Sequence, residues 1–273
     1  MRFKVSKVPV SMSDKKKSYY KYYAQPIYGG PSERYEQIKK GPSDNKDALH
    51  ITKRNDLFKL GNLPSEFGYW LMDDGSALIA NSTFFPNTTG EMFDWWFVWH
   101  GIDRLRYAIW DNEDHYDVQL EDYKKALDLS LSMRERHWGS VHHIWEDIGL
   151  GTFDKLIIRF KNPASFGYDV DKIGTEACNS LVCANVDVLG DDTRPDVPVV
   201  MTHFLRPCKG GSELRSRFWF GWHIINGEPV KLIPDSVKIP DTAPIALLGH
   251  NVKEFSNLAR ILPLVYAEEK DNW

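Results

Sequence analysis

Hydrophobic and polar positions follow a strand-like pattern in two neighbouring segments, which predict the hairpin that opens the regular part of the chain. In FGYWLMDDGSALIANSTFF, which starts at Phe67, two apolar runs flank Asp73–Ser76, a sequence typical of a tight turn. Strand-like runs recur later, with Asn226-Gly227 as another turn signal; they span 154–160, 184–190, 197–205 and 216–225. The pattern predicts a series of antiparallel strands.

Helical spacing predicts elements on both sides of these strands. The segment 92–110 repeats its aromatic and aliphatic residues at helical intervals and follows TTGE (88–91), a start typical of a helix cap, so one or two helices follow the hairpin. A further amphipathic segment lies at 123–131. The last helix follows Pro244, which suits a first helical turn, and is predicted to end before Pro263.

The last predicted helix is strongly amphipathic. With each residue turning by about 100°, its apolar residues share one arc, opposite Lys253, Ser256 and Arg260; the arc holds Leu247, Leu248, Val252, Phe255, Leu258, Ala259 and Leu262. Such a helix packs against a sheet. Strands, intervening helices and a closing helix predict an α+β fold, in which a curved sheet wraps around a helix and leaves a pocket between them.

The first 65 residues have a different character from the rest. They are rich in Lys, Tyr, Gly, Pro and Ser and show only short periodic segments. We therefore divide the chain into a small, loosely structured N-terminal region, 1–65, and a main domain, 66–273.

Composition narrows the classes of ligand and location. Apolar residues make up 42% and aromatic residues 13% of the 273 positions, as expected for a globular protein with flat side chains available for a pocket. A formal net charge of −4 argues against nucleic acid or an anionic membrane as partner, and favours a small or neutral ligand. Three cysteines without a close pair, and no apolar run of about 18 residues, predict a cytoplasmic protein.

Two groups of residues could bind a metal ion. In GHNVKEF (249–255), His250 and Glu254 stand one helical turn apart at the edge of the apolar arc, and both side chains are zinc ligands. The alternative is a solvated surface pair. A second group of possible ligands lies upstream and comprises His115, His137, His142, His143 and Glu146. The alternative interpretation of this group is a polar surface loop. The spacing alone does not show which of these residues bind a metal ion.

His203 is a further candidate. It lies in the predicted strand MTHFLRP and points to one face of the sheet, where it is either a hydrogen-bonded core histidine or an acid or base facing a pocket. The chain lacks a GxSxG elbow, a phosphate-binding glycine loop and a dinucleotide fingerprint, which argues against a serine esterase and against nucleotide- and nicotinamide-dependent enzymes. Metal-assisted hydrolysis is the remaining enzymatic hypothesis.

Several motifs together resemble the zinc-dependent acylphloroglucinol hydrolases, the family of phloretin and 2,4-diacetylphloroglucinol hydrolases. The matching segments keep their order and spacing over about residues 67–262; they are RLRYAIWDNEDHYD (104–117), HHIWED (142–147), THFLRP with ELRSRFWFG (202–221) and GHNVKEF. The resemblance implies a helix-grip fold, like that of pollen-allergen domains. It also implies a homodimer that the N-terminal region helps to form.

The resemblance also implies a site. The family's zinc ligands are a histidine, a glutamate 31 positions later and a C-terminal HxxxE, which match His115, Glu146, His250 and Glu254. The family's pocket tyrosine and histidine match Tyr107 and His203, which are expected to bind the substrate ring and move protons. Phe218 stands where the diacetylphloroglucinol enzymes are expected to have a second tyrosine. Four protein ligands resemble a closed structural site, whereas catalysis needs an open position. Our own hypothesis is that Glu146, which lies outside the HxxxE helix, loosens and acts as base for the attacking water.

The function that the resemblance implies is zinc-dependent hydrolysis of the bond between aryl ring and acyl carbonyl. The preferred substrate is phloretin, giving phloroglucinol and 3-(4-hydroxyphenyl)propionate. One alternative is hydrolysis of mono- or diacetylphloroglucinol. The other is a non-catalytic helix-grip module that binds a hydrophobic aromatic ligand, with His250 and Glu254 solvated.

Overall fold

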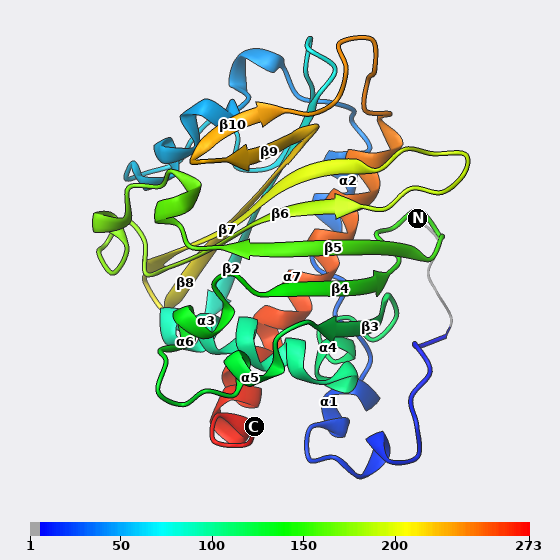
Figure 1. Ribbon diagram of the computed structural model, residues 1–273, viewed down its shortest axis with the longest axis vertical. Helices are drawn as coiled ribbons and strands as arrows, with labels where there is room; N and C mark the ends of the chain where they lie inside the picture. The colour runs from blue at the N-terminus through cyan, green and yellow to red at the C-terminus, as the bar shows by residue number, and fades with distance from the viewer. Residues whose placement is uncertain (1–5) are drawn as a thin grey trace.

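A curved antiparallel sheet of eight strands forms the centre of the computed structural model, which describes residues 6–273 (Figure 1). The strand order is β1-β2-β8-β7-β6-β5-β4-β3, and β9 pairs with β10 in a separate ribbon. The strands are β1 (Gly68–Leu71), β2 (Ala77–Pro86), β3 (His115–Leu120), β4 (Val141–Glu146), β5 (Asp154–Lys161), β6 (Ser180–Val188), β7 (Val197–Cys208), β8 (Gly211–Phe220), β9 (Trp222–Ile225) and β10 (Glu228–Lys231).

Seven α-helices and several short 3-10 helices are found in the described residues. The α-helices are α1 (Tyr20–Ala24), α2 (Ser32–Ile38), α3 (Gly90–Trp99), α4 (Arg104–Ala108), α5 (Tyr123–Ala126), α6 (Met133–His137) and α7 (Thr242–Glu269). The 3-10 helices are η1 (Asp14–Lys16), η2 (Asn45–Asp47), η3 (Ile51–Phe58), η4 (His100–Ile102), η5 (Ala164–Phe166) and η6 (Val170–Lys172).

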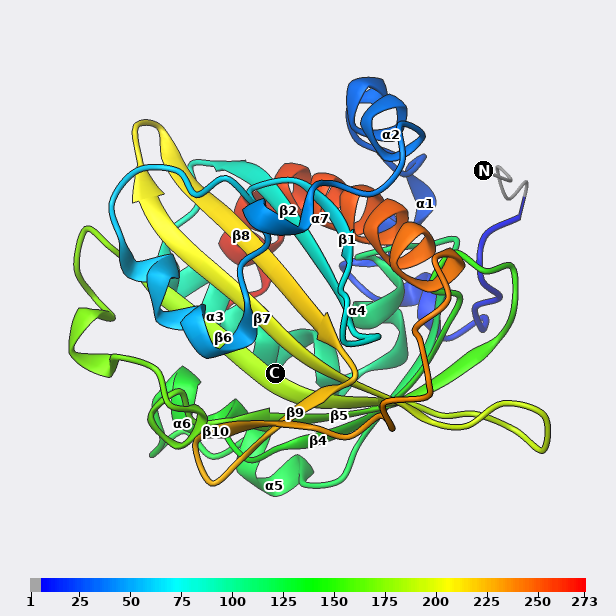
Figure 2. The same cartoon turned by 90° about the horizontal axis from the view of Figure 1, so that it is seen from above.

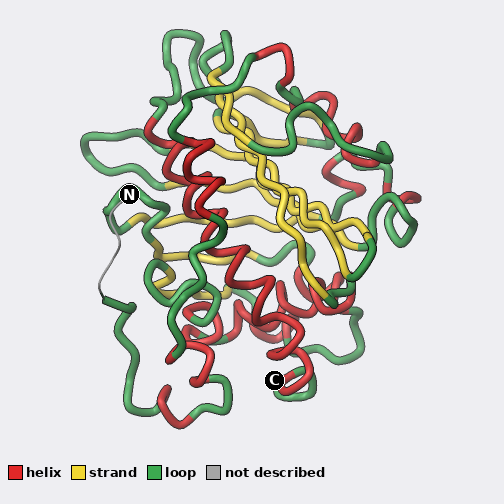
Figure 3. The backbone as a smooth tube through the Cα atoms, turned by 180° about the vertical axis from the view of Figure 1, so that it is seen from behind, coloured by secondary structure: helices red, strands yellow, loops and turns green. Residues whose placement is uncertain are grey.

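Helix α7 lies across the concave face of the sheet (Figures 2 and 3). Its apolar arc faces inward: Leu248, Phe255, Leu258 and Leu262 are all completely buried. Because burying one such side chain contributes about 1.5–3 kcal/mol, this stripe holds the helix firmly on the sheet. The predicted α+β class and helix-grip arrangement are confirmed.

The turns and the first helix form where their sequences predict. Gly75 has φ +83° in the turn between β1 and β2, a left-handed conformation that glycine adopts without strain. Asn226 and Gly227, with φ of 53° and 83°, form the two-residue turn between β9 and β10. Thr89 caps α3 by accepting a hydrogen bond from the backbone N–H of Met92 at 3.3 Å. Helices α3 and α4 follow the hairpin as predicted.

The prediction of one strand over 216–225 is wrong. Gly221, with φ +90°, separates β8 from β9, so only the first half of that run joins the large sheet. A Cβ atom at this position would lie 2.8 Å from Cδ1 of Ile233, so packing as well as backbone conformation requires glycine here. The chain therefore leaves the sheet at Gly221 and folds back as the β9–β10 ribbon.

The prediction that the last helix ends before Pro263 is also wrong, because α7 continues to Glu269. Proline removes one backbone N–H donor from a helix, but the turns that follow it are held by side chains. Val265 is completely buried, and the hydroxyl of Tyr266 donates to Glu91 at 2.7 Å. Packing against α3 thus outweighs the local cost of the proline.

Two strands were missed in the histidine-rich region. The surface-loop reading of HWGSVHHIWED is wrong for its second half, which forms β4 between β3 and β5. The amphipathic segment at 123–131 contains only the short α5, and α6 starts separately after Ser132, which forms a capping box with Glu135. Strands β3 and β4 form the edge of the sheet that carries His115 and Glu146.

Residues 49–58 cover the convex face of the sheet. Ile51 and Leu57 are completely buried in a core cluster that also contains Phe204 of β7 and Trp219 of β8. Beside it, the Glu66 carboxylate accepts hydrogen bonds from the completely buried guanidinium groups of Arg215 and Arg217, the shortest at 2.5 Å and 2.9 Å respectively. None of the helices in residues 6–273 combines the length and the apolar character that crossing a bilayer requires.

Candidate active site

Strands β3 and β4 place a histidine and a glutamate side by side at the edge of the sheet. His115 and Glu146 are paired residues in the β3–β4 register, and both side chains are buried. A β-bulge between His115 and Asp117 interrupts the pairing there, a feature that re-aims side chains at sheet edges. His115 Nε2 lies 3.6 Å from Glu146 Oε2.

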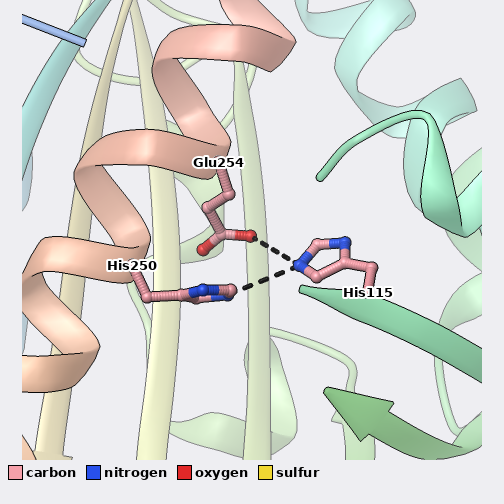
Figure 4. A group of neighbouring side chains, drawn as sticks. All are labelled: His115, His250 and Glu254. Carbon is pink, nitrogen blue, oxygen red and sulfur yellow. Dashed lines mark hydrogen bonds and ion pairs between the residues drawn. The ribbon is translucent and has the colours of Figure 1, made fainter. Parts of the chain in front are cut away.

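Helix α7 brings two further ligand-type side chains to the same point. His250 and Glu254 are one turn apart on its buried face, and both point toward His115 (Figure 4). His115 Nε2 lies 3.4 Å from His250 Nε2 and 3.7 Å from Glu254 Oε2. His115, His250 and Glu254 each present an atom within 4.8 Å of the others.

These separations fit a metal site. Four ligands at about 2.0–2.2 Å from a zinc ion in tetrahedral geometry lie about 3.3–3.6 Å from each other. Two imidazole nitrogens that approach to 3.4 Å beside buried carboxylates need either a proton or a cation between them. The chemistry of the donors, nitrogen and carboxylate oxygen, suits Zn²⁺ and other divalent transition metals.

Neighbouring groups orient each of these side chains. His115 Nδ1 lies 3.3 Å from the backbone oxygen of Tyr107, so its N–H is held there and Nε2 keeps its lone pair. His250 Nδ1 lies 3.7 Å from Asp114 Oδ2. The Asn251 amide donates to Glu254 at 3.0 Å. Such partners fix the direction in which a ligand presents its free electron pair.

A second group of ligand-type residues, Asp111, Asp114 and His250, lies next to the first. Lys253 balances part of its negative charge, because its ammonium lies 3.0 Å from Asp111 Oδ2 and also hydrogen-bonds Asp114. Lys253 itself is part of α7, one turn from His250 on the helix. We therefore assign this second group to the support of His250.

The buried charges perturb each other's ionisation. Burial alone would lower the pKa of His250, but the nearby carboxylates of Asp114, Glu254 and Glu146 raise it to about 10. Burial raises the pKa of Glu254 to about 8, against the opposing effect of His250. Protons on His250 and Glu254 thus compensate the site when no cation is bound, and a bound metal would replace them.

Tyr107 connects this group to a pocket. Its hydroxyl donates a short hydrogen bond to Glu146 Oε2, and its ring stacks on the His115 imidazole with centroids 4.1 Å apart. Burial and the Glu146 carboxylate raise the pKa of Tyr107 well above its ordinary value, so the phenol stays protonated. The hydroxyl therefore acts as a fixed proton donor to Glu146.

The pocket lies between the sheet, α7 and the α3–α4 segment. Tyr107, Glu146, His250 and Glu254 line one side of it. His203 of β7 and Phe218 of β8 line it as well. Most of its other walls are aliphatic or aromatic, which suits a flat hydrophobic ligand.

His203 is held as a neutral base. Its Nδ1 lies 2.9 Å from the Ser216 hydroxyl, and its ring lies against Phe218 and Phe255, with centroids 5.5 Å and 4.8 Å away. Burial lowers the pKa of His203 to about 3, so it carries no charge at neutral pH. A neutral imidazole both donates and accepts hydrogen bonds.

The structure brings all seven predicted residues to this pocket or its wall. Of the other candidates, His142 lines the pocket, whereas the His143 ring bonds Glu121 at 2.8 Å on the exposed face of β4. Sequence reasoning missed Asp114 and His100. Asp114 was visible as the acidic residue next to His115 in DNEDHYD, but its partner on α7 was not.

Comparisons with known proteins show the family of the chain. The model of the DAPG hydrolase PhiG domain family matches residues 49–267. Phloretin hydrolase of Eubacterium ramulus is 43% identical over 270 residues, which cover 98% of this chain and 96% of that protein. 2,4-Diacetylphloroglucinol hydrolase of a Pseudomonas species is 30% identical over 271 residues, covering 92% and 88%.

Among solved structures, Ara h 8.0201 aligns with a TM-score of 0.42 and 11% identity, covering 70% of this chain and 99% of that one. The match to phloretin hydrolase extends over nearly the whole chain, and the range 49–267 that the family model matches contains the residues that converge at the pocket. The chain belongs to the DAPG hydrolase PhiG domain family.

Proposed function

We propose that this protein hydrolyses the carbon–carbon bond between the aryl ring and the acyl carbonyl of an acylphloroglucinol, with phloretin as preferred substrate. The products are phloroglucinol and 3-(4-hydroxyphenyl)propionate. The observation that carries the proposal is the convergence of His115, His250 and Glu254 at one wall of an aromatic pocket, in a chain whose relatives include a phloretin hydrolase.

We assign zinc as the cofactor and His115, Glu146, His250 and Glu254 as the residues that would hold it. The bound ion supplies a Lewis acid, which lowers the pKa of water and polarises a carbonyl oxygen. Two histidines and one glutamate are a ligand set of catalytic zinc sites, which keep one position open. Glu146 is the ligand that yields, because Tyr107 already engages one of its oxygens.

Glu146 and Tyr107 form the proton path. Glu146 accepts a proton from the attacking water, whose oxygen forms a bond to the acyl carbon. The bond between acyl and ring carbon breaks, and its electron pair stays with the ring. Tyr107, which already donates to Glu146, passes a proton to that ring carbon and recovers one from Glu146. Water is thereby divided between the carboxylic acid and phloroglucinol.

Tyr107, His203 and Phe218 position the ring. The Tyr107 hydroxyl and the neutral His203 imidazole are two of the polar groups that line the pocket. Phe218 offers a flat apolar surface at 5.5 Å from the His203 ring. Hydroxyls ortho to the acyl group let the ring reach a keto tautomer, in which the scissile unit resembles a β-diketone.

Product analysis tests the proposal. Purified protein is incubated with phloretin, monoacetylphloroglucinol and 2,4-diacetylphloroglucinol, and phloroglucinol or its monoacetyl form is measured by liquid chromatography. We expect release from all three, with the highest kcat/KM for phloretin. No release from any of them contradicts the function, and a higher kcat/KM for an acetylated substrate contradicts the assigned preference.

We also propose that the protein works as a homodimer in which residues 1–65 contribute to the interface. In support, Met12, Tyr28 and Leu60 are apolar side chains of this region that are 73%, 47% and 66% exposed and are thus available for contact with a second chain. Analytical ultracentrifugation should give twice the 31.5 kDa of one chain. A monomer at micromolar concentration contradicts the proposal.

A further inference from the structure

The pocket has two ends of different polarity. We call inner end the part lined by Phe97, His100, His142, Phe160 and His203, which are all at most 3% exposed. Their rings form one connected cluster. The centroids are 5.9 Å apart for His100 and His142, 4.9 Å for His142 and Phe160, and 5.7 Å for Phe97 and His203.

The outer end is apolar. Ile148, Val188 and Leu247 line it, and Val188 is only half-buried. The loop between β4 and β5 meets the first turns of α7 there, since a Cβ atom on Gly149 would lie 2.8 Å from the Ala246 backbone oxygen. A flexible hydrocarbon chain fits this end, whereas three imidazoles at the inner end call for a ligand with several hydroxyl groups.

His142 has an acceptor atom that nothing in residues 6–273 satisfies. The Ser140 hydroxyl gives its one proton to the His137 backbone oxygen at 2.6 Å, so toward His142 Nε2, at 3.5 Å, it acts as acceptor. The N–H of His142 is therefore on Nε2, and Nδ1 carries a lone pair. This Nδ1 is buried without a hydrogen-bond partner. A buried acceptor without a partner destabilises the pocket unless a ligand donates to it.

The other groups at the inner end reinforce this polarity. His100 Nδ1 donates to the Trp96 backbone oxygen at 2.7 Å, so its other nitrogen is also an acceptor. Burial lowers the pKa of His100 to about 4 and that of His142 well below its ordinary value, so both stay neutral. Acceptors of this kind recognise hydroxyl donors, which phenols supply.

The position of His142 on β4 relative to Glu146 suits a ligand of a particular length. His142 and Glu146 point to the same face of the strand, four residues and hence about 13 Å apart. In an aryl ketone, the acyl oxygen and a ring hydroxyl para to it are about 6 Å apart, and a hydrogen bond of about 2.8 Å at each end brings the span to about 12 Å. The length of a hydroxylated aryl ketone with its two hydrogen bonds thus matches the backbone separation of Glu146 and His142.

We propose that His142 binds, through Nδ1, the hydroxyl para to the acyl group, so that the hydroxylated ring occupies the inner end and the acyl chain leads to the outer end. The inference rests on the proposed function for its substrate class. It adds a specificity residue beyond Tyr107 and His203. It also predicts that the site accepts acyl chains of different length, because the outer end is apolar and partly open.

The test compares phloretin with two analogues: one without the ring hydroxyl para to the acyl group, and one without the hydroxyl on the far phenyl ring. Dissociation constants are measured by calorimetry on chelator-treated protein, which does not consume the ligands, and KM and kcat on the protein as purified. We expect the wild type to bind the first analogue at least tenfold more weakly than phloretin, and the second about equally.

In His142→Phe, which keeps a ring of similar size, phloretin and the first analogue should bind alike. His143→Phe is the matched control, since its side chain lies on the opposite face of β4, and it should discriminate like the wild type. His142→Asn keeps an acceptor and should retain part of the discrimination. If His142→Phe does not fold, this variant and the wild-type comparison decide.

Equal binding of phloretin and the first analogue by the wild type overturns the inference, as does discrimination that survives in His142→Phe. A loss that follows the far phenyl hydroxyl instead shows the opposite orientation and overturns it too. Failure of the proposed function is distinguishable, because it appears as absent product release while calorimetry still reports on His142.

Discussion

Replacing Asp114 with asparagine should weaken zinc binding without removing a ligand. Asp114 Oδ2 lies 3.7 Å from His250 Nδ1 and also holds the Lys253 ammonium. Although burial opposes ionisation, His250 and Lys253 keep the pKa of Asp114 below its ordinary value, so the group is a carboxylate at neutral pH. Its charge makes His250 a stronger base toward a metal at Nε2.

The size of the effect follows from this arrangement. Asparagine keeps the size of the side chain and an amide oxygen near His250 Nδ1, but the negative charge is lost. Losing a partner of this kind typically weakens metal affinity about 10- to 100-fold, or about 1.4–2.7 kcal/mol. We expect Asp114→Asn to fall in that range. Asp111 remains 3.0 Å from Lys253, so the helix keeps one buried ion pair.

The assay is a competition between the protein and a chromophoric chelator for zinc at pH 7.5. Glu113→Gln is the matched control, because this substitution also removes one negative charge near Lys253, which lies 3.5 Å from Glu113. In the described residues, no contact joins Glu113 to His250. Its zinc affinity should stay within about twofold of the wild type. An unchanged affinity in Asp114→Asn, or an equal loss in both variants, refutes the reasoning.

Three further predictions concern catalysis, packing and pH. Glu146→Gln should retain most of its zinc, held by the other three ligands, but lose at least about 100-fold in phloroglucinol release; full turnover with full zinc contradicts the role of base. Phe255→Ala should lower the free energy of unfolding by about 3–5 kcal/mol in urea titrations, because Phe255 is completely buried beside Trp110 and His203; a loss below about 1 kcal/mol contradicts this. Burial opposes ionisation of Glu66, but Arg215 and Arg217 lower its pKa from 4.5 to about 2. The Glu66 carboxylate therefore stabilises the fold fully above pH 4.5, and this stabilisation is lost as the pH falls toward 2. The free energy of unfolding of Glu66→Gln should change less with pH over this range than that of the wild type, and an equal change argues against the reasoning.

Local patterns in the sequence predict much of the scaffold. Turn residues at Gly75 and Gly227, the cap at Thr89 and the apolar arc of α7 act over a few positions, so periodicity and turn chemistry reveal them. The helix continues past Pro263 because distant side chains pack on its last turns, which no local rule contains.

The candidate site is less accessible to sequence reasoning. The spacing of His250 and Glu254 places them on one side of a helix, but their meeting with His115 depends on the register of β3 with β4 and on how α7 crosses the sheet. The family resemblance supplied that link. The roles of Asp114 and His142 stayed hidden because each depends on one neighbour far away in the chain or on a missing partner. Zinc and the individual catalytic roles remain predictions.

The central claim is tested most directly by reconstitution. Protein depleted of metal by a chelator is titrated with zinc, and phloroglucinol release from phloretin is followed at each addition. Turnover should be absent at the start and recover linearly to a plateau at one zinc per chain, while His250→Ala stays inactive throughout. Turnover that persists in metal-free protein, or a plateau that zinc does not restore, contradicts the account.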